Sequence, residues 1–554
     1  MDDSLKHEKR GLGTVHAFIL RNFKSTGKEW QPVIWVLALL VGIVTAYAVI
    51  GFRLLIAGVQ WSAFGVATEH LYTTAQTLAW WQIMLAPTLG GVVVGLLLYL
   101  GGRWGAIPDE HAHGVADVME ARGLHAGKIQ LSTGLISALI SGVSLGAGAS
   151  TGREGPAVHL GASISSLLAS RMGYTPIIAR TFLACGAAAA VSASFNTPLA
   201  GVLFALEVVL GHYALSVFAP VVIASVAATI ITRIELGEFP TFILPAHDFG
   251  SYAQLPAFVL LGIVSGVVAI IFMKSSIFLE FLARDATEKF SLPLWIKPAI
   301  AGLLVGVLAL VFPQILGVGY EATEAAHKGL FSLWLLVALI GVKILATSIS
   351  LAGRFGGGVF SPALYLGTMT GAAFGIVAGA LFPDLVASKG FYAIVGMGAV
   401  SAAILGAPIS TTLIAFELVR EYQVTIAVMV SVSIATLLTQ AVLGRSFFHW
   451  QIEQHGYHLS EGPQDALLHI ITVRDVMTRD FSGFDREELD EEPHPTLKES
   501  DDLKTVFALM ESENVDTLAV VDEEKEDVIG LVRRNACLSF FNQALIQAHV
   551  ESHH

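Results

Sequence analysis

An arginine and a glutamate stand together within apolar sequence, in the stretch Gly152-Arg153-Glu154-Gly155-Pro156. An ionised side chain at membrane depth is costly unless protein or water surrounds it, so such residues usually have a function. Glycines let a backbone approach a ligand closely, and a proline suits the first turn of a helix. The stretch therefore predicts a loop that leads into a helix N-terminus, whose unpaired amide groups favour an anion.

The composition places this stretch in a polytopic membrane protein. Of 554 residues, 54% are hydrophobic and only 14% are charged, whereas soluble proteins carry about 25% charged residues. The net charge of −13 reflects an acidic excess after residue 460, and no basic surface for nucleic acid is indicated. Cys185 and Cys537 lie far apart in the sequence, which predicts two unpaired thiols and no disulfide or metal site.

The apolar segments must position the charged pair. Val33–Ala57 and Ile83–Leu100 are long enough to cross ~30 Å of hydrocarbon. Shorter segments follow, rich in small residues and interrupted by glycine or proline, such as Leu199–Leu210. Broken helices at membrane depth are tolerated only where protein or a watery cavity surrounds their ends, which favours a transport architecture. Residues 1–31 form a basic arm that we expect in the cytoplasm, with no removable signal peptide.

Two halves of the apolar region repeat each other, at roughly 110–235 and 295–445. The run from Pro156 to Gly161 matches the run from Pro362 to Gly367. Further along, Pro198 and Glu207 match Pro408 and Glu417 in the same order. Internal symmetry of this kind places a substrate site at the repeat interface near the membrane midplane.

A soluble tail follows the membrane region. The hydrophobic pattern ends near residue 450, residues 451–470 form a polar linker, and residues 471–554 form a separate small domain. Alternation and periodicity predict strands at 471–473, 517–521 and 528–532, with helices at 503–512 and 535–548. The acidic stretch 485–492 is expected to be a solvated loop.

The sequence resembles the CLC family of chloride channels and chloride/proton antiporters over residues 30–450. The resemblance rests on Gly152-Arg153-Glu154-Gly155-Pro156, Gly357-Gly358-Val359-Phe360-Ser361-Pro362, the preceding Lys343 and Thr347, and Ala407-Pro408 with Glu417. It implies an all-α polytopic membrane fold over residues 32–450, with inverted repeats of broken and tilted helices. It also implies a homodimer in the lipid bilayer, one anion pathway per subunit, and no enzymatic activity.

The resemblance assigns roles to individual residues. Glu154 is similar to the gating glutamate, whose carboxylate competes with anions; the alternative is a structural ion pair with Arg153. The amides of Val359 and Phe360 would donate to a central anion. The full expected anion-binding set is His113, Gly114, Gly152, Arg153, Gly155, Gly358, Val359, Phe360 and Phe448.

Three positions depart from the family pattern. His113 stands where the family usually has a serine; it could bind an anion, make conduction sensitive to pH, or be an ordinary interfacial histidine. Val208 follows Glu207, where antiporters carry a second glutamate for intracellular protons. Phe448 stands where a tyrosine hydroxyl usually reaches the anion. The last two departures favour a passive channel.

The tail resembles a cystathionine-β-synthase-type (CBS) unit, through Val473–Thr478, Ala519–Asp522 and Val528–Val532. A pair of such units normally makes a nucleotide cleft, so two subunits could supply one each; otherwise the unit has no ligand. No cofactor is expected, and chloride is the transported ion.

We expect a chloride channel in the cell (inner) membrane, gated by Glu154, with both termini cytoplasmic. The main alternative is a chloride/proton antiporter of the same fold. More distant alternatives are a membrane-embedded enzyme that uses Glu154 with His113 or His159 as acid and base, and a non-conducting sensor.

Overall fold

The computed structural model describes residues 31–67, 71–107, 111–237, 254–383, 389–419, 422–454, 468, 471–479, 496–521 and 528–553. The basic arm (1–30), most of the linker and the acidic stretch 485–492 lie outside the described residues. The chain divides into two compact units. One contains residues 1–213 and 217–448, and the other contains Ala214–Ser216 and His449–His554.

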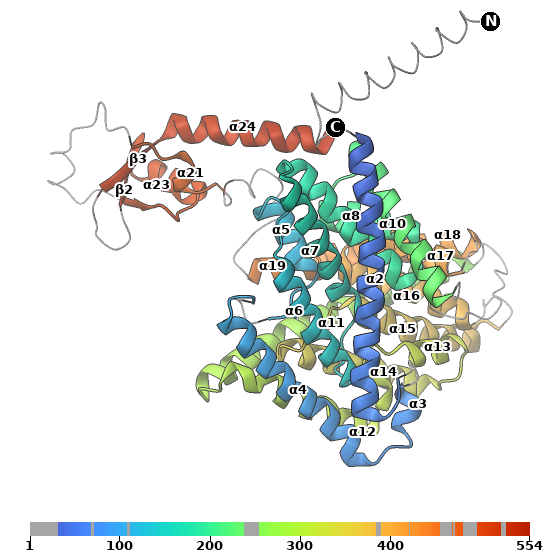
Figure 1. Cartoon of the computed structure of the whole chain (residues 1–554). Helices are drawn as coiled ribbons and strands as arrows, with labels where there is room; N and C mark the ends of the chain where they lie inside the picture. The colour runs from blue at the N-terminus through green and yellow to red at the C-terminus, as the bar shows by residue number, and fades with distance from the viewer. Residues whose placement is uncertain are drawn as a thin grey trace, which may run out of the picture. The chain divides into compact units, whose positions relative to one another are not determined.

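The regular elements described in the first unit are all helices, and Figure 1 shows them coloured in chain order. The helices of the first half are α2 Gln31–Phe64, α3 Leu71–Ala75, α4 Trp80–Arg103, α5 Val115–Leu124, α6 Leu131–Gly146, α7 Glu154–Met172, α8 Pro176–Phe195, α9 Pro198–Phe204, the π-helical η1 Ala205–Leu210, and α10 Leu215–Leu236. Those of the second half are α11 Leu255–Lys289, the short 3-10 helices η3 Leu294–Ile296 and η4 Pro313–Ile315, α12 Lys297–Val311, α13 Tyr320–His327, α14 Leu333–Ala352, α15 Phe360–Leu381, α16 Lys389–Leu405, α17 Pro408–Val419, α18 Tyr422–Leu443 and α19 Phe447–Gln454.

The helices confirm a membrane-spanning protein built partly from short segments. Nine helical segments within the described residues are long and apolar enough to cross a bilayer. Four apolar helices are shorter: Leu131–Gly146, Pro198–Leu210, Gly390–Leu405 and Pro408–Val419. The long helix α2 packs across α6, α7 and α8 (Figure 1). Among the short helices, α16 is buried from Gly390 to Leu405 and packs against α11, α15 and α18, as a broken helix at membrane depth requires.

The same turn breaks the helices in both halves. Helix α8 ends at Asn196, which has a positive φ of 60°, and Pro198 begins α9. In the second half Gly406 has a φ of 69°, and Pro408 begins α17. A left-handed residue ends a helix and a proline suits the first turn of the next. The repeated sequence thus forms the same break twice.

Close helix contacts also repeat. A Cβ atom on Gly161 would lie 2.4 Å from the carbonyl oxygen of Gly186, so α7 and α8 approach until their backbones touch. In the second half a Cβ on Gly367 would lie 2.4 Å from the carbonyl oxygen of Gly396, between α15 and α16. Small residues permit this close packing in membranes. The repeat predicted from sequence therefore appears in three dimensions.

Helix α19 spans the boundary between the two units, because Phe447 and Phe448 belong to the first unit and His449–Gln454 belong to the second. The side chains of Trp450 and Ile452 are buried along this helix.

The second unit contains a small α/β domain. Strand β1 (Thr496–Lys498) pairs in parallel with β2 (Thr517–Val521), and β2 pairs antiparallel with β3 (Val528–Arg533). Helix α23 (Leu503–Ser512) connects β1 and β2, and α24 (Arg534–His553) follows β3. Their apolar side chains form one core that includes Val506, Val520 and Cys537.

The prediction of a strand at 471–473 is wrong. Thr472 makes one isolated bridge to Asp502, and helix α21 begins at Val473 (Val473–Val476). The Asp475 carboxylate accepts a hydrogen bond from the Thr472 amide at 3.0 Å, which forms a capping box. This local cap outweighed the apolar pattern.

Both cysteines are buried and unpaired, as predicted. Burial raises the pKa of the Cys537 thiol to about 11, so it stays protonated at neutral pH and is a poor nucleophile.

Candidate functional site

The two glycine motifs of the repeat are joined directly by their backbones. The Gly152 amide donates to the Gly358 carbonyl at 2.7 Å, and the Gly358 amide donates to the Gly152 carbonyl at 2.7 Å. A Cβ atom on Gly155 would lie 3.2 Å from the Gly358 Cα and 3.9 Å from the Gly114 Cα. All three predicted backbone segments therefore meet at one place, and a side chain on Gly152, Gly155 or Gly358 would crowd it.

Three helices begin at this junction. Helix α5 begins at Val115, α7 at Glu154 and α15 at Phe360, each directly after or within one of the glycine segments. A helix N-terminus carries unpaired amide donors and roughly half a positive charge. Their convergence creates a positive region made of partial charges, which suits weak binding of an anion.

Glu154 is the ionisable residue at the centre of the junction, and its side chain is fully buried. The Tyr320 hydroxyl donates to Oε1 at 2.5 Å, and the Ser361 hydroxyl donates to Oε2 at 2.5 Å. Arg153 Nε lies 3.9 Å from Oε1, at the outer limit of an ion pair. Two hydroxyl groups therefore hold the Glu154 carboxylate more closely than Arg153 does.

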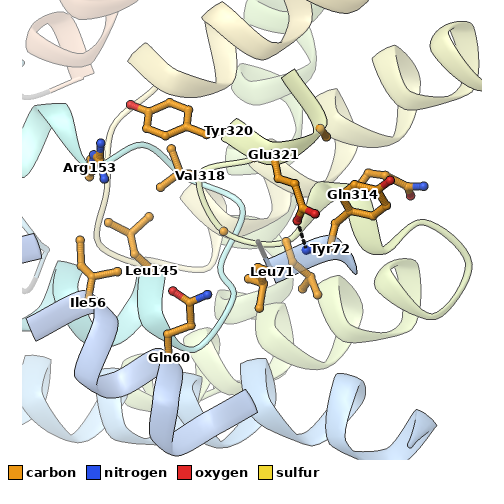
Figure 2. Close-up of a pocket in the computed structure, with 14 residues that line it drawn as sticks. Ile56, Gln60, Leu71, Tyr72, Leu145, Arg153, Gln314, Val318, Tyr320 and Glu321 are labelled. Carbon is orange, nitrogen blue, oxygen red and sulfur yellow. Dashed lines mark hydrogen bonds between the residues drawn. The ribbon is translucent and has the colours of Figure 1, made fainter. Parts of the chain in front are cut away.

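Arg153 and Tyr320 border a cavity of about 60 Å³. The Arg153 guanidinium lies 4.8 Å from the centre of the Tyr320 ring, and the two side chains lie next to each other in the wall of the cavity (Figure 2). Gln60 and Gln314 add polar groups to the wall. The cavity exceeds the volume that one water needs. Tyr320 thus connects this cavity to the buried Glu154.

Tyr320 was not predicted as a site residue. It begins α13 after a loop, Gly317-Val318-Gly319, that no repeat or motif marked. The buried Lys343 holds this loop, because its Nζ donates to the carbonyls of Ile315 at 3.1 Å and Gly317 at 3.2 Å. Lys343 is therefore a positioning residue for Tyr320.

The second motif places its side chains in the core. Val359 and Phe360 are both buried. The Phe360 ring centre lies 5.1 Å from that of Phe195 and 5.8 Å from that of Phe204. Ring packing fixes the start of α15 against α8 and α9, so the Phe360 side chain has a clear role in packing.

His113 belongs to a histidine cluster before α5. Its ring stacks on His111 with 4.7 Å between centres and meets His159 edge-on at 5.1 Å. His111 Nε2 lies 3.1 Å from Asp117 Oδ1, while Asp117 Oδ2 accepts from the Gly114 amide at 2.6 Å. His159, which stands in the repeated sequence of α7, thus lies beside His113.

Glu207 and Glu417 cap each other's half of the molecule. The Glu207 carboxylate accepts from the amides of Ile409 (3.0 Å) and Ser410 (2.7 Å) at the start of α17. The Glu417 carboxylate accepts from the amides of Leu199 (3.1 Å) and Ala200 (2.8 Å) at the start of α9. The repeated Pro and Glu positions therefore form two matching caps across the repeat interface.

This chain is similar in sequence and in fold to known proteins. The sequence profile described as voltage gated chloride channel matches residues 90–440, and the CBS-domain profile matches residues 473–542. A ClcB-like chloride channel protein of Ralstonia nicotianae is 34% identical over 397 residues, which are 71% of this chain and 90% of that relative. The chain belongs to the CLC family.

Other CLC proteins extend the comparison. The ClC-type chloride channel ClcB of Escherichia coli O157:H7 is 29% identical over 423 residues, covering 76% of this chain and 98% of the relative. The crystal structure of a slow cyanobacterial Cl⁻/H⁺ antiporter covers 76% of this chain and 97% of its own, with a TM-score of 0.66 and 24% identity. That structure supports the fold alone. As a CLC protein, this chain is an integral membrane protein that transports anions across the membrane.

Not every predicted site residue of this CLC protein lies at the junction. Gly114, Gly152, Glu154, Gly155 and Gly358 meet there. Phe448 is buried at the start of α19, where the neighbouring Phe447 ring packs on Phe272, and its contact with an anion stays a prediction. Val208 is buried in η1, beside the capping residue Glu207.

Proposed function

We propose that this CLC protein is a passive chloride channel gated by Glu154. The observation that supports the proposal concerns the side chains of Glu207 and Val208. Val208 is apolar and buried, and the Glu207 carboxylate is engaged at the start of α17. Val208 offers no titratable group where antiporters carry a second glutamate, and the Glu207 carboxylate already serves as a helix cap. Chloride then moves without an obligatory proton.

The proposed gate is the Glu154 carboxylate. It lies where the three helix ends meet, so it occupies the place that the helix ends offer to an anion. An arriving chloride competes with it for this positive region, and protonation removes its charge. Release of the bonds from Tyr320 and Ser361 opens the pathway.

A flux experiment tests the channel mechanism. The full chain is reconstituted into liposomes with an outward chloride gradient and valinomycin with potassium, and chloride efflux and external pH are recorded together. We expect chloride efflux without proton uptake. Proton uptake in fixed proportion to chloride efflux would show an antiporter instead.

The Glu154→Gln variant tests the gate in the same assay. The neutral amide mimics the protonated carboxyl, so we expect higher chloride flux at neutral pH and a weaker dependence of flux on pH. Glu324→Gln is the matched control, because Glu324 forms an exposed pair with Lys328 on α13. If Glu154→Gln leaves both the flux and its pH dependence unchanged, the gate is elsewhere.

The proposal includes the assembly and orientation. We place a homodimer in the cell (inner) membrane with both termini cytoplasmic; the basic residues of the N-terminal arm support this orientation. Light scattering of the purified protein in detergent gives its mass, and a monomer mass would contradict the dimer. A reporter fused at either terminus should be active only on the cytoplasmic side.

A further inference from the structure

Two imidazoles and a carboxylate converge on one point before and within the first turn of α5. His111, His113 and Asp117 each offer one ligand atom, and these atoms all lie within 4.8 Å of one another. We propose that this cluster is a binding site for a transition-metal dication, with zinc as the ion to test. The expected effect on transport rests on the proposed function, whereas metal binding does not.

The spacing of the donor atoms fits a small tetrahedral ion. Asp117 Oδ1 lies 3.1 Å from His111 Nε2 and 3.7 Å from His113 Nδ1. Zinc binds imidazole nitrogen and carboxylate oxygen at about 2.0–2.2 Å, so its ligands stand about 3.3–3.6 Å apart in a tetrahedron. Two of the three pairs are near this spacing, and the histidine pair lies within 4.8 Å, so rotation of the side chains can complete the site.

The ligands are held in place by a second layer of contacts. Asp117 uses Oδ2 to accept from the Gly114 amide, which leaves Oδ1 turned toward the histidines. The His113 amide donates to the Ser137 hydroxyl at 3.2 Å. Such outer contacts orient metal ligands and raise affinity. Helix capping explains the use of Oδ2, but it does not require two histidines beside Oδ1.

A second observation points to a ligand at the cluster. His159 is almost completely buried, packs edge-on against His113, and its Nδ1 has no hydrogen-bond partner among the described residues. A buried polar atom without a partner calls for an explanation such as an ion or ordered water. Zinc in a site with three protein ligands keeps a water in its fourth position, and such a water is a suitable partner for His159.

The donor types select the class of metal. Imidazole suits zinc, copper and nickel, while magnesium and calcium prefer sets made only of oxygen. The ion would sit next to Gly114, whose Cα approaches Gly155 at the junction of the helix ends. A conducting site must bind its ion weakly enough to release it. A dication here would hold chloride too tightly and fix the loop, so zinc should inhibit transport.

The first experiment measures metal binding alone. Zinc is titrated into the purified full chain in detergent against a competing chromophoric chelator. His111→Gln is the test variant, since His111 is partly exposed and the change is compatible with folding. We expect the number of tightly bound zinc ions per chain to be one higher in the unaltered chain than in His111→Gln. His113→Gln, which removes a second ligand, should show the same loss.

The matched control is His125→Gln. His125 follows the same helix α5 and pairs with Glu120, and it is not one of the three ligands of the cluster. This variant should bind as much zinc as the unaltered chain. Equal zinc binding by the unaltered chain, His111→Gln and His113→Gln would overturn the proposal.

The second experiment measures transport. Micromolar zinc should inhibit chloride efflux from liposomes that contain the unaltered chain or His125→Gln, and millimolar magnesium should not. In His111→Gln the zinc concentration for half inhibition should rise at least about tenfold. If zinc binds at the cluster and flux continues unchanged, the inhibitory role is wrong. If the chain binds zinc but passes no chloride in its absence, the metal site stands and the proposed function fails.

Discussion

At the scale of single residues, the main feature of this protein is the set of groups around the buried Glu154 carboxylate. A fully buried carboxylate is tolerated because two hydroxyl donors and the end of α7 replace its water. None of these partners is a close permanent charge, since Arg153 Nε stands 3.9 Å away. A carboxylate held by hydroxyl groups can be released at lower cost than one in a tight ion pair. The arrangement therefore suits a movable gate.

Tyr320→Phe should open that gate. The change removes one hydrogen bond to the carboxylate while the ring remains to pack against Arg153. A hydrogen bond to a charged group contributes about 1.5–3 kcal/mol, so the closed position loses stability relative to the open one. We expect chloride flux at neutral pH to rise by about tenfold or more, measured in liposomes.

Tyr365→Phe is the control for this prediction. Tyr365 is fully buried, and its hydroxyl has no hydrogen-bond partner among the described residues. Removal of the Tyr365 hydroxyl should leave the chloride flux unchanged. Equal flux in the Tyr320 variant and the unaltered chain would mean that the Tyr320 bond does not hold the gate.

At the scale of elements, the reciprocal caps tie the two halves together. Each glutamate lies near the end of one short helix and accepts from the first amides of the matching helix in the other half. Amides at the start of a helix have no partner within it, and a carboxylate also interacts favourably with the helix dipole. The interface between the repeats is therefore stabilised by the same contact twice.

Removing either cap should destabilise the membrane unit. Glu207→Ala and Glu417→Ala each leave amides of α17 or α9 without their acceptor, at a cost of about 1–2 kcal/mol. Glutamine at either position should recover part of the loss. Thermal unfolding in detergent measures the effect. Glu324→Ala serves as the control because exposed pairs contribute about 0–1 kcal/mol. If the Glu207 and Glu417 variants unfold at temperatures as high as the Glu324→Ala control, the capping role is contradicted.

The close contact between α7 and α8 at Gly161 leads to a second prediction at the scale of elements. In Gly161→Ala the new methyl group would overlap the backbone of α8, so α7 and α8 must separate. Overpacking of this kind costs about 1–3 kcal/mol. We expect a lower unfolding temperature and a reduced yield of folded protein. Gly51→Ala in α2 meets no atom within 4 Å and should behave like the unaltered chain. Similar stability of the two variants would contradict the close contact.

At the scale of the whole molecule, the chain contains two units with separate cores. The membrane unit is organised by helix contacts of small residues, while the tail has its own apolar core between a three-stranded sheet and helices. Each core is complete within its unit. The units should therefore lose their structure independently.

Val506→Asp tests this independence. Val506 is fully buried in the core of the tail, and an unpaired carboxylate there costs several kcal/mol. We expect limited proteolysis to remove the tail of this variant while chloride flux per reconstituted protein is retained. Glu511→Gln, an exposed change on the same helix α23, should leave the tail resistant. Loss of flux in the Val506 variant would show that transport requires a folded tail.

The sequence by itself determined the features that depend on local pattern. Apolar length and the low charge predicted a membrane protein, and the repeated Pro156 and Pro362 motifs predicted two helix ends at one site. The structure brings these ends together through Gly152 and Gly358. Such features are readable because helix starts, membrane spans and internal repeats are all encoded within short stretches. Short segments such as 471–473 were not readable, because one local cap decides their structure.

Only the tertiary structure decided which distant side chains meet. Tyr320 stands 166 positions from Glu154, and Glu207 stands more than 200 positions from the amides that it caps. His159 meets His113 only because α7 packs against α5. The repeat marked Glu207 but not its partners, since hydrogen bonds and ring contacts between helices depend on the packing of the whole unit. The sequence therefore predicted where the helix ends meet, and the fold supplied the partners of Glu154.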